Sequence, residues 1–228
     1  FNIKGVIALY NRKDLLGLRD LSADEIMTIL NTAKEMKAKI DNPSLRDDSL
    51  SKSSIVTLFY ENSTRTKMSF MLAGDYQGAI VKDLGVATSS VSKGESLVDT
   101  GVTLDQMGIN IMIIRHQMTG AAHLLAKNVK ASVVNAGDGS NEHPTQALLD
   151  LFTIMEKKGS FEGLKVVILG DISHSRVARS NAFGLTKLGA KVTLAGPSTL
   201  VSNSMKSLGV EVETDIPKAI KDADVVMG

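Results

Sequence analysis

Short apolar runs alternate with amphipathic segments along the chain, and this alternation restricts the fold more than any other feature of the sequence. Runs such as "IVTLFY", "INIMIIR", "ASVVNA" and "KVVILG" have the length and composition of buried strands. The segments between them place apolar residues at helical spacing. Strands that are separated by helices form parallel sheets from βαβ units, so the sequence predicts an α/β fold.

The predicted elements are eight strands and eight helices. The strands are residues 55–60, 79–84, 109–115, 131–136, 165–170, 191–196, 210–214 and 223–227, and the helices are residues 22–40, 64–77, 95–107, 119–128, 144–158, 175–188, 199–208 and 216–222. The first helix has Ser22 as its N-cap and Glu25 three residues later, which together form a capping box.

The predicted strands fall into two groups, with a break near residues 158–163. We therefore expect two parallel-sheet three-layer domains, the second incomplete, because the chain ends at Gly228 directly after a predicted strand. Residues 1–143 form the first predicted domain and residues 159–228 the second, partial one. The helix of residues 144–158 bridges them.

The composition excludes several classes of protein and of site. The 228 residues carry a net charge of +1, whereas a general nucleic-acid binder needs a clear excess of Lys and Arg to attract phosphates. The absence of cysteine excludes disulfides, thiolate metal sites and a cysteine nucleophile. No run reaches the roughly 18 to 20 apolar residues of a membrane span. We expect a soluble cytoplasmic protein without nucleic-acid or membrane partners.

The segment "NSTRT" lies where a predicted strand gives way to a helix. With Ser63 as the N-cap, Thr64, Arg65 and Thr66 lie in the first turn. A helix N-terminus attracts anions through unsatisfied N–H groups and a partial positive charge, and hydroxyl and guanidinium groups add donors. A cation there opposes the helix dipole unless an anion is bound. The alternative is that Ser63 only caps the helix and its neighbours are solvated.

A second candidate segment is "HPTQ". Pro144 suits the first helical position, which makes His143 the cap and places Gln146 in the first turn. His143 can donate a hydrogen bond to a carbonyl oxygen, and the Gln146 amide can pair with an N–H or amino group. His143 could equally be only a helix cap.

Two further segments fit the same chemistry. "IMIIRH" ends a predicted strand with Arg115 and His116, at the sheet edge where parallel-sheet enzymes expose their site residues. "SSVSKGES" places Ser89 and Lys93 in a loop before a predicted helix. Either segment could instead be a solvated loop. The "NSTRT" segment is not a P-loop, since it has no Gly-rich loop with Gly-Lys-Ser/Thr, and "LGDISHSR" is not a dinucleotide-binding fingerprint.

Taken together, these segments resemble the aspartate/ornithine carbamoyltransferase family. The family signature F-x-x-x-S-T-R-T-x-x-S-F is matched by "FYENSTRTKMSF", and "LLGLRDLS", "SKGESLVDT", "IIRH", "HPTQ" and "GDISHSRVARS" also match in order. Threonine in "HPTQ", where ornithine enzymes usually carry cysteine, resembles the aspartate branch. The resemblance extends over the chain from about Leu9.

The resemblance implies a role for each candidate residue. Ser63, Thr64, Arg65 and Thr66 would cradle the phosphate of carbamoyl phosphate. Thr66, Arg115 and His143 would hold the carbamoyl oxygen, Gln146 the carbamoyl nitrogen, and Arg176 a carboxylate of aspartate. Ser89 and Lys93 would reach into a neighbouring subunit's site. A homotrimer with shared active sites follows from that analogy, and a regulatory subunit is a further partner that the family allows.

The implied reaction transfers the carbamoyl group of carbamoyl phosphate to the α-amine of L-aspartate, giving N-carbamoyl-L-aspartate and phosphate in the second step of pyrimidine synthesis. The donor is already activated, so no cofactor or metal is expected. Family members are longer and carry an Arg-x-Gln segment and a Pro-Leu turn that are not found here. Two alternatives therefore stay open: transfer to another amine such as ornithine, and a non-catalytic carbamoyl-phosphate-binding or oligomerisation fragment.

Overall fold

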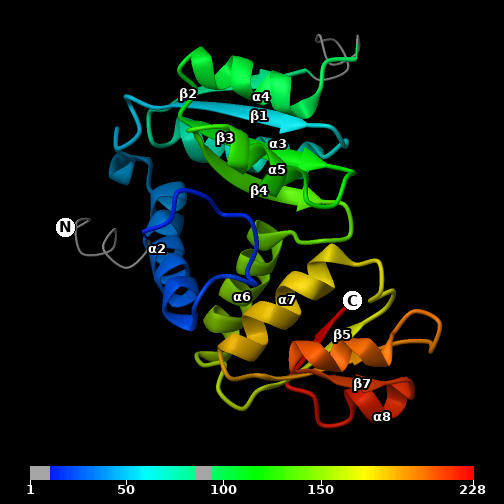
Figure 1. Cartoon of the computed structure of the whole chain (residues 1–228). Helices are drawn as coiled ribbons and strands as arrows, with labels where there is room; N and C mark the ends of the chain where they lie inside the picture. The colour runs from blue at the N-terminus through cyan, green and yellow to red at the C-terminus, as the bar shows by residue number, and fades with distance from the viewer. Residues whose placement is uncertain (1–10, 86–93) are drawn as a thin grey trace. The chain divides into compact units, whose positions relative to one another are not determined.

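The structure is a computed structural model that describes residues 11–85 and 94–228 (Figure 1). It contains two compact units, each built around its own parallel sheet. The first unit comprises the described residues up to Leu16 together with Asn31–Asn141, and the second comprises Gly17–Leu30 and Glu142–Gly228. The predicted α/β fold with two parallel sheets is confirmed.

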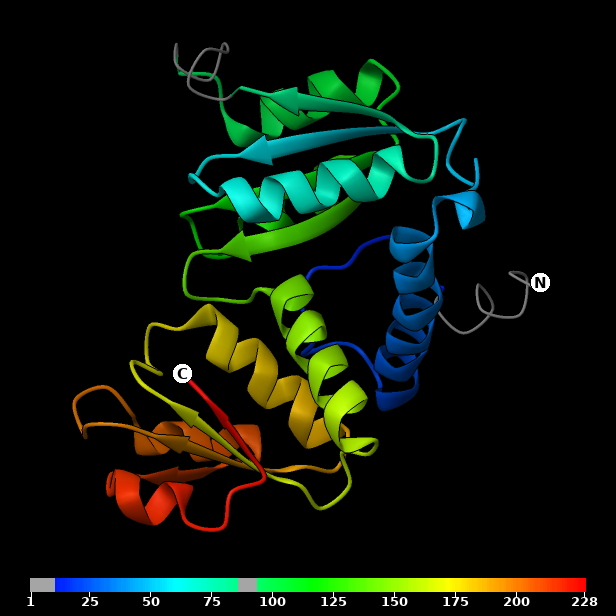
Figure 2. The same ribbon diagram turned by 180° about the vertical axis from the view of Figure 1, so that it is seen from behind.

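The first unit is a four-stranded parallel sheet with the strand order β2-β1-β3-β4. Helix α3 packs against β1 and β2, while α5 packs against β3 and β4 and also contacts α4 (Figures 1 and 2). The elements are β1 (Ser54–Phe59), α3 (Thr64–Asp75), β2 (Ile80–Leu84), α4 (Leu97–Gln106), β3 (Ile111–His116), α5 (Ala121–Asn128) and β4 (Ser132–Asp138), with a short 3-10 turn η1 (Pro43–Leu45).

Alternate residues of these strands fill two separate apolar clusters, because successive side chains of a strand point to opposite faces of the sheet. One cluster joins Leu58, Met112 and Ile114 to Leu125 of α5. The other is formed by Ile55, Phe59, Ile113 and Ala136. Apolar side chains on both faces explain why the strands appear in the sequence as continuous apolar runs.

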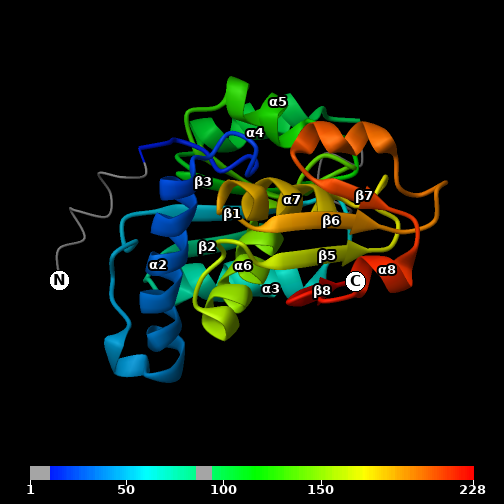
Figure 3. The ribbon, with the colours of Figure 1, turned by 90° about the horizontal axis from the view of Figure 1, so that it is seen from below.

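The second unit has four parallel strands in the order β7-β6-β5-β8 (Figure 3). Its elements are α6 (Pro144–Lys158), β5 (Lys165–Leu169), α7 (Arg176–Lys187), β6 (Lys191–Ala195), the 3-10 helix η4 (Asn203–Leu208), β7 (Glu211–Glu213), α8 (Ile216–Ile220) and β8 (Val225–Met227). Helices α6 and α7 pack closely at Gly184, where a Cβ atom would lie 2.8 Å from Leu151 Cδ1. A larger side chain at Gly184 would force the Leu151 side chain to shift.

Helix α2 (Ala23–Asp41) begins as the capping box predicts. The backbone N–H of Ser22 donates to Glu25 Oε2 at 2.7 Å, and the N–H of Glu25 donates to Ser22 Oγ at 3.1 Å. Every predicted strand is present, with its ends shifted by a residue or two. The helix predicted over residues 199–208 is wrong, because only Asn203–Leu208 is helical, and as a 3-10 helix. The Ser202 side chain accepts from Ser204 N and favours this tighter turn.

The units divide the chain differently from the predicted domains at two places. Glu142, His143 and the helix predicted to bridge the domains, residues 144–158, all lie in the second unit. Gly17–Leu30 lies in the second unit, although it precedes the first sheet in the chain. Two side chains of the second unit hold the beginning of this segment: Glu142 accepts from the N–H of Leu18 at 2.7 Å, and Lys187 Nζ donates to the Leu18 carbonyl at 2.8 Å. Lys187 also donates to the carbonyls of Arg19 and Leu21.

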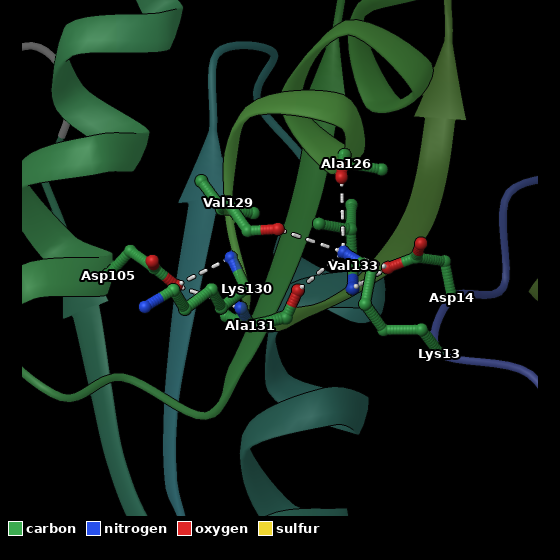
Figure 4. Close-up of polar contacts among 8 residues, drawn as sticks. All are labelled: Lys13, Asp14, Asp105, Ala126, Val129, Lys130, Ala131 and Val133. Atoms are coloured by element: carbon green, nitrogen blue, oxygen red, sulfur yellow. Dashed lines mark hydrogen bonds and ion pairs between the residues drawn. The ribbon is translucent and has the colours of Figure 1, made fainter.

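A polar cluster fastens the segment before α2 to the first sheet (Figure 4). Lys13 Nζ donates to three carbonyl oxygens at 3.0 to 3.1 Å, those of Ala126, Val129 and Ala131. Asp14 Oδ1 accepts from Val133 N at 2.8 Å and lies 3.2 Å from Lys13 Nζ. One ammonium group therefore satisfies three carbonyls where α5 ends and β4 begins, a place where helix carbonyls lack intrahelical partners.

We predict that Lys13→Met lowers the free energy of unfolding by about 1–3 kcal/mol, since three carbonyl oxygens lose a charged donor. Urea denaturation measures the change. The matched control is Lys127→Met, because Lys127 is an exposed lysine in the last turn of α5, the helix whose final carbonyls Lys13 contacts. Equal effects of the two substitutions would contradict a specific role for the Lys13 ammonium group.

Candidate active site

The N-terminus of α3 presents four side chains that can bind an anion. Ser63 is the N-cap, with φ −160° and ψ 95°, but its side chain makes no capping hydrogen bond. Among the described residues, the side chains of Ser63, Thr64, Arg65 and Thr66 have no hydrogen-bond or ion-pair partner, and the first turn contains no acidic residue. The predicted cap position and helix start are confirmed, while the Ser63 hydroxyl stays available to a ligand.

Arg65 and Lys67 are both cations, but only Lys67 is paired with a carboxylate among the described residues. Lys67 Nζ forms an ion pair with Asp83 Oδ2 at 2.9 Å, and Thr57 Oγ1 donates to the same carboxylate at 2.6 Å. Burial acts to raise the pKa of Asp83, but the hydrogen bonds from Thr57 and Lys67 outweigh it and lower this pKa. Lys67 is thus neutralised within the unit, and Arg65 is the exposed cation at this helix end.

Arg115 lies at the carboxyl end of β3, directly opposite Phe59 of β1 in the sheet register. Its Nε donates to Glu61 Oε2 at 3.0 Å, and its Nη1 lies 3.4 Å from the carbonyl oxygen of Ala136. The guanidinium group is therefore held between the ends of three neighbouring strands. The sequence analysis did not predict Glu61. A carboxylate two residues before the donor-rich segment "STRT" could have indicated it as a partner for a nearby cation.

His116, the other candidate at this strand end, makes contacts that stabilise the loop after β3. Its Nδ1 accepts from Met118 N at 2.8 Å, and its ring centroid lies 4.6 Å from that of Tyr60. Burial lowers the pKa of His116, although the charges of Glu61 and Asp138 act in the opposite direction. The neutral imidazole is the form that can accept the Met118 hydrogen bond.

In the second unit, His143 is the N-cap of α6 and Pro144 its first residue, as predicted. The His143 side chain makes no capping bond; its Nδ1 lies 3.4 Å from Thr145 Oγ1. The backbone N–H of His143 instead donates to Ser180 Oγ of α7 at 2.9 Å. Tertiary structure, and not only the cap position, therefore fixes this buried histidine.

Ser180 also connects His143 to a buried carboxylate. Ser180 Oγ donates to Glu142 Oε2 at 3.0 Å, and the same carboxylate accepts from the N–H groups of Leu18 and Arg19 at 2.7 and 3.3 Å. Burial raises the pKa of Glu142, and these hydrogen bonds only partly oppose that effect. A Cβ atom at Gly17 would overlap the carboxylate, so a larger residue there would displace the Glu142 side chain.

Gln146 lies in the first turn of α6, and its amide is held by two residues that sequence reasoning missed. Gln146 Nε2 donates to Asp150 Oδ1 at 3.0 Å, and Asn181 Nδ2 of α7 donates to Asp150 Oδ2 at 2.7 Å. Asp150 follows Gln146 by four residues, a spacing that brings side chains together on a helix. That spacing could have indicated Asp150, but nothing in the sequence indicates Asn181.

Arg176 is the first residue of α7, where Ser175 is the N-cap and accepts from Ala178 N at 3.1 Å. This helix follows β5, the strand that lies between β6 and β8. Ligands of open α/β sheets bind beyond the carboxyl end of such a strand. Arg176 is half-buried, and no acidic residue lies in the first turn of α7.

The predicted site residues thus fall into two sets. Ser63, Thr64, Arg65, Thr66 and Arg115 gather at the carboxyl edge of the first sheet, and His143, Gln146 and Arg176 belong to the second unit. Ser89 and Lys93 lie outside the described residues. Within residues 11–85 and 94–228 no acidic or histidine cluster could hold a metal ion. No helix in those ranges is long and apolar enough to cross a membrane.

The first unit and α6 also match a known family. The sequence profile described as "Aspartate/ornithine carbamoyltransferase, carbamoyl-P binding domain" matches residues 13–156. The chain belongs to the aspartate/ornithine carbamoyltransferase family. The aspartate carbamoyltransferase catalytic subunit of Acetivibrio thermocellus is 62% identical over 216 residues, which cover 95% of this chain and 69% of that protein. The same subunit of Caldanaerobacter subterraneus subsp. tengcongensis is 56% identical, with coverages of 95% and 71%.

Solved carbamoyltransferases share the fold. Aspartate transcarbamoylase from Trypanosoma cruzi, in complex with carbamoyl phosphate, matches with a TM-score of 0.86 at 29% identity, covering 97% of this chain and 72% of that chain. Ornithine carbamoyltransferase from Pyrococcus furiosus matches with a TM-score of 0.84 at 34% identity, with coverages of 93% and 70%. Both branches of the carbamoyltransferase family therefore have this fold.

The buried Glu142 predicts a pH dependence of stability. Folding raises the pKa of Glu142 above its ordinary value of 4.5, so its contribution to stability is full below that value and is lost as the pH rises through the folded pKa. Gln does not titrate. The free energy of unfolding of Glu142→Gln, relative to the wild type, should therefore rise across this window and level off above it.

Urea denaturation at a series of pH values from about 4 to 8 measures this difference. The control is Glu156→Gln, which removes a carboxylate from an exposed position of α6. A difference for Glu142→Gln that stays constant with pH would show that the buried carboxyl group does not titrate differently in the folded state.

Proposed function

We propose that this chain binds carbamoyl phosphate and transfers its carbamoyl group to the α-amine of L-aspartate, giving N-carbamoyl-L-aspartate and phosphate. The observation that carries the proposal is the N-terminus of α3, where Arg65 and three hydroxyl groups have no partner among the described residues. The relatives that are 52% to 62% identical are aspartate carbamoyltransferase catalytic subunits. Aspartate transcarbamoylase from Trypanosoma cruzi has been solved with carbamoyl phosphate and aspartate.

The phosphate group fits the chemistry of this helix end. The backbone N–H groups of the first turn and the hydroxyls of Ser63, Thr64 and Thr66 donate hydrogen bonds, and Arg65 supplies a fixed positive charge. Since Lys67 is paired with Asp83, the charge of Arg65 is the one that a bound phosphate would neutralise. A bound phosphate would also offset the unfavourable interaction of the Arg65 charge with the helix dipole.

We infer that Thr66, Arg115 and His143 stabilise the carbamoyl oxygen. The amine nitrogen of aspartate forms a bond to the carbamoyl carbon, and negative charge develops on the oxygen before the bond to the phosphate oxygen breaks. A preorganised donor at such an oxygen typically contributes about 3 kcal/mol in the transition state. The Glu61 carboxylate holds Arg115 in a fixed orientation before substrate arrives, which is what preorganisation requires.

The proton of the attacking amine can leave with the departing phosphate. Phosphate gains negative charge as the bond breaks, and we infer that Arg65, Lys93 and the α3 N-terminus stabilise it. No side-chain base is then needed, and holding the two substrates in line provides much of the remaining acceleration. We further propose that Gln146 binds the carbamoyl nitrogen and that Arg176 binds a carboxylate of aspartate.

Aspartate is the acceptor that the relatives support. The "HPTQ" segment favours the aspartate branch, and the curated relatives carry that name. The fold alone does not decide, because the ornithine enzyme of Pyrococcus furiosus shares it. The homotrimer, the sharing of Ser89 and Lys93 between subunits, a regulatory subunit and a cytoplasmic location stay predictions.

The phosphate cradle predicts that Arg65→Ala weakens binding of carbamoyl phosphate by about 100-fold or more. Two charge-assisted hydrogen bonds of about 1.5–3 kcal/mol each account for this loss. Isothermal titration calorimetry measures the binding, and urea denaturation should show little change in stability because Arg65 is exposed. The control is Lys82→Ala, an exposed cation on β2. Binding to Arg65→Ala near the wild-type affinity would refute the cradle.

The acceptor is tested by incubating carbamoyl phosphate with either L-aspartate or L-ornithine and measuring the carbamoylated product. The assay is run with this chain and with any longer form of it. We expect N-carbamoyl-L-aspartate as the product. Carbamoylation of ornithine with aspartate left untouched would contradict the assignment to the aspartate branch, and binding without any product would favour the non-catalytic alternative.

A further inference from the structure

Asp150 joins α6 to α7 by accepting one hydrogen bond on each of its carboxylate oxygens. Oδ1 accepts from Gln146 Nε2 at 3.0 Å, and Oδ2 accepts from Asn181 Nδ2 at 2.7 Å. Asn181 is fully buried, and its Oδ1 atom has no partner among the described residues. The carboxylate of Asp150 is therefore the group that pairs the NH2 end of the buried Asn181 side chain.

This arrangement determines which way the Gln146 amide is turned. An ionised carboxylate can only accept hydrogen bonds, so the NH2 end of the amide must face Asp150. The carbonyl oxygen, Oε1, is then the end directed away from Asp150. Within the described residues Gln146 Oε1 has no hydrogen-bond partner, and it is left as an acceptor.

We propose that Asp150 and Asn181 are positioning residues that fix the Gln146 amide with its oxygen toward the substrate, so that this position selects an N–H donor. The inference rests on the proposed binding of carbamoyl phosphate. The carbamoyl group carries an NH2 group where an acetyl group carries a methyl group. With Asp150 in place, Gln146 Oε1 accepts a hydrogen bond from the carbamoyl NH2 group. Acyl phosphates that lack this NH2 group therefore bind less well.

We expect position 150 to require a carboxylate and not an amide. Asparagine has the same shape but only one acceptor oxygen, while both Gln146 and Asn181 present NH2 groups. Because Asn181 is fully buried, leaving its NH2 group unpaired carries a desolvation cost. In Asp150→Asn the single oxygen therefore faces Asn181, and the new NH2 group faces Gln146. The Gln146 amide must then turn over and direct its own NH2 group at the substrate.

A second substitution should restore the wild-type orientation of the Gln146 amide. In the double variant Asp150→Asn with Asn181→Asp, the carboxylate at position 181 accepts from the NH2 group at position 150. The oxygen at position 150 then faces Gln146 and accepts from Nε2, as the wild-type carboxylate does. The two substitutions exchange the carboxylate and the amide, and they restore the original orientation of Gln146.

Two stable ligands that differ only at the group in question test the proposal. Phosphonoacetamide has the NH2 group, and acetonylphosphonate has a methyl group in its place. Calorimetry on the wild-type chain should show about tenfold tighter binding of phosphonoacetamide, the factor expected for one net hydrogen bond. Asp150→Asn should lose about tenfold in affinity for phosphonoacetamide and keep its affinity for acetonylphosphonate. The double variant should recover the preference.

A second readout does not depend on any ligand. The side-chain NH2 resonances of Gln146, measured by ¹⁵N–¹H NMR, should change in Asp150→Asn and return toward wild type in the double variant. Urea denaturation of each variant identifies simple loss of folding. The control is Glu156→Gln, which removes an exposed carboxylate from the same helix and should leave both ligand affinities unchanged.

The outcomes separate this inference from the proposed function. A wild-type chain that binds neither ligand overturns the proposed function, and the inference falls with it. A wild-type chain that prefers phosphonoacetamide, together with an Asp150→Asn variant that keeps the same preference and the same Gln146 resonances, overturns the positioning role alone. Loss of the preference in Asp150→Asn without recovery in a folded double variant also counts against it.

Discussion

The parallel pairing of the strands is the constraint on which the candidate site depends. In a parallel sheet all strands end at the same edge, so segments far apart in the chain meet there. In the first unit this brings the segment after β1 beside the end of β3, with Phe59 and Arg115 opposite each other in the register. The N-terminus of α3 then lies at the same edge, because only residues 60–63 separate the end of β1 from the start of this helix. The fold thereby supplies both the donors of a helix end and a strand-end arginine.

The residues that the sequence suggests are mostly donors, and the structure shows the acceptors that hold them. Arg115 is held by Glu61, and Gln146 is held by Asp150. The backbone of His143 is held through Ser180 by Glu142. At Arg115 and Gln146 a carboxylate thus fixes the orientation of a side chain that is proposed to meet substrate, and at His143 a carboxylate helps to hold the backbone. Such preorganisation is what allows a donor to stabilise a transition state without rearrangement during the reaction.

Burial affects the carboxylates of Glu142 and Asp83 differently. Glu142 is buried, and burial raises its pKa even though three groups donate hydrogen bonds to it. Its charge therefore costs stability, while its hydrogen bonds tie Leu18, Arg19 and α7 to the start of α6. Asp83 shows the opposite balance, because the hydrogen bonds from Thr57 and Lys67 outweigh burial. The ionised Glu142 therefore lowers stability at the start of α6, whereas the ionised Asp83 raises it beside α3. The ion pair with Asp83 also neutralises Lys67, so that Arg65 is the cation left for an anion.

The sequence by itself determined the order and type of almost every element, because period and run length separate strands from helices. It also indicated the helix starts: the capping box at Ser22 and Pro144 at the first position of α6 are local features. Ser63 takes the N-cap position of α3 without a side-chain hydrogen bond. The helix predicted over residues 199–208 was wrong for a local reason too. The Ser202 hydroxyl accepts a hydrogen bond from the backbone N–H two residues later, which favours the 3-10 turn. Only the tertiary structure decided which partners complete the candidate site. Asn181 lies 31 residues from Asp150, and Arg115 lies 54 from Glu61, so their contacts depend on how helices and strands pack.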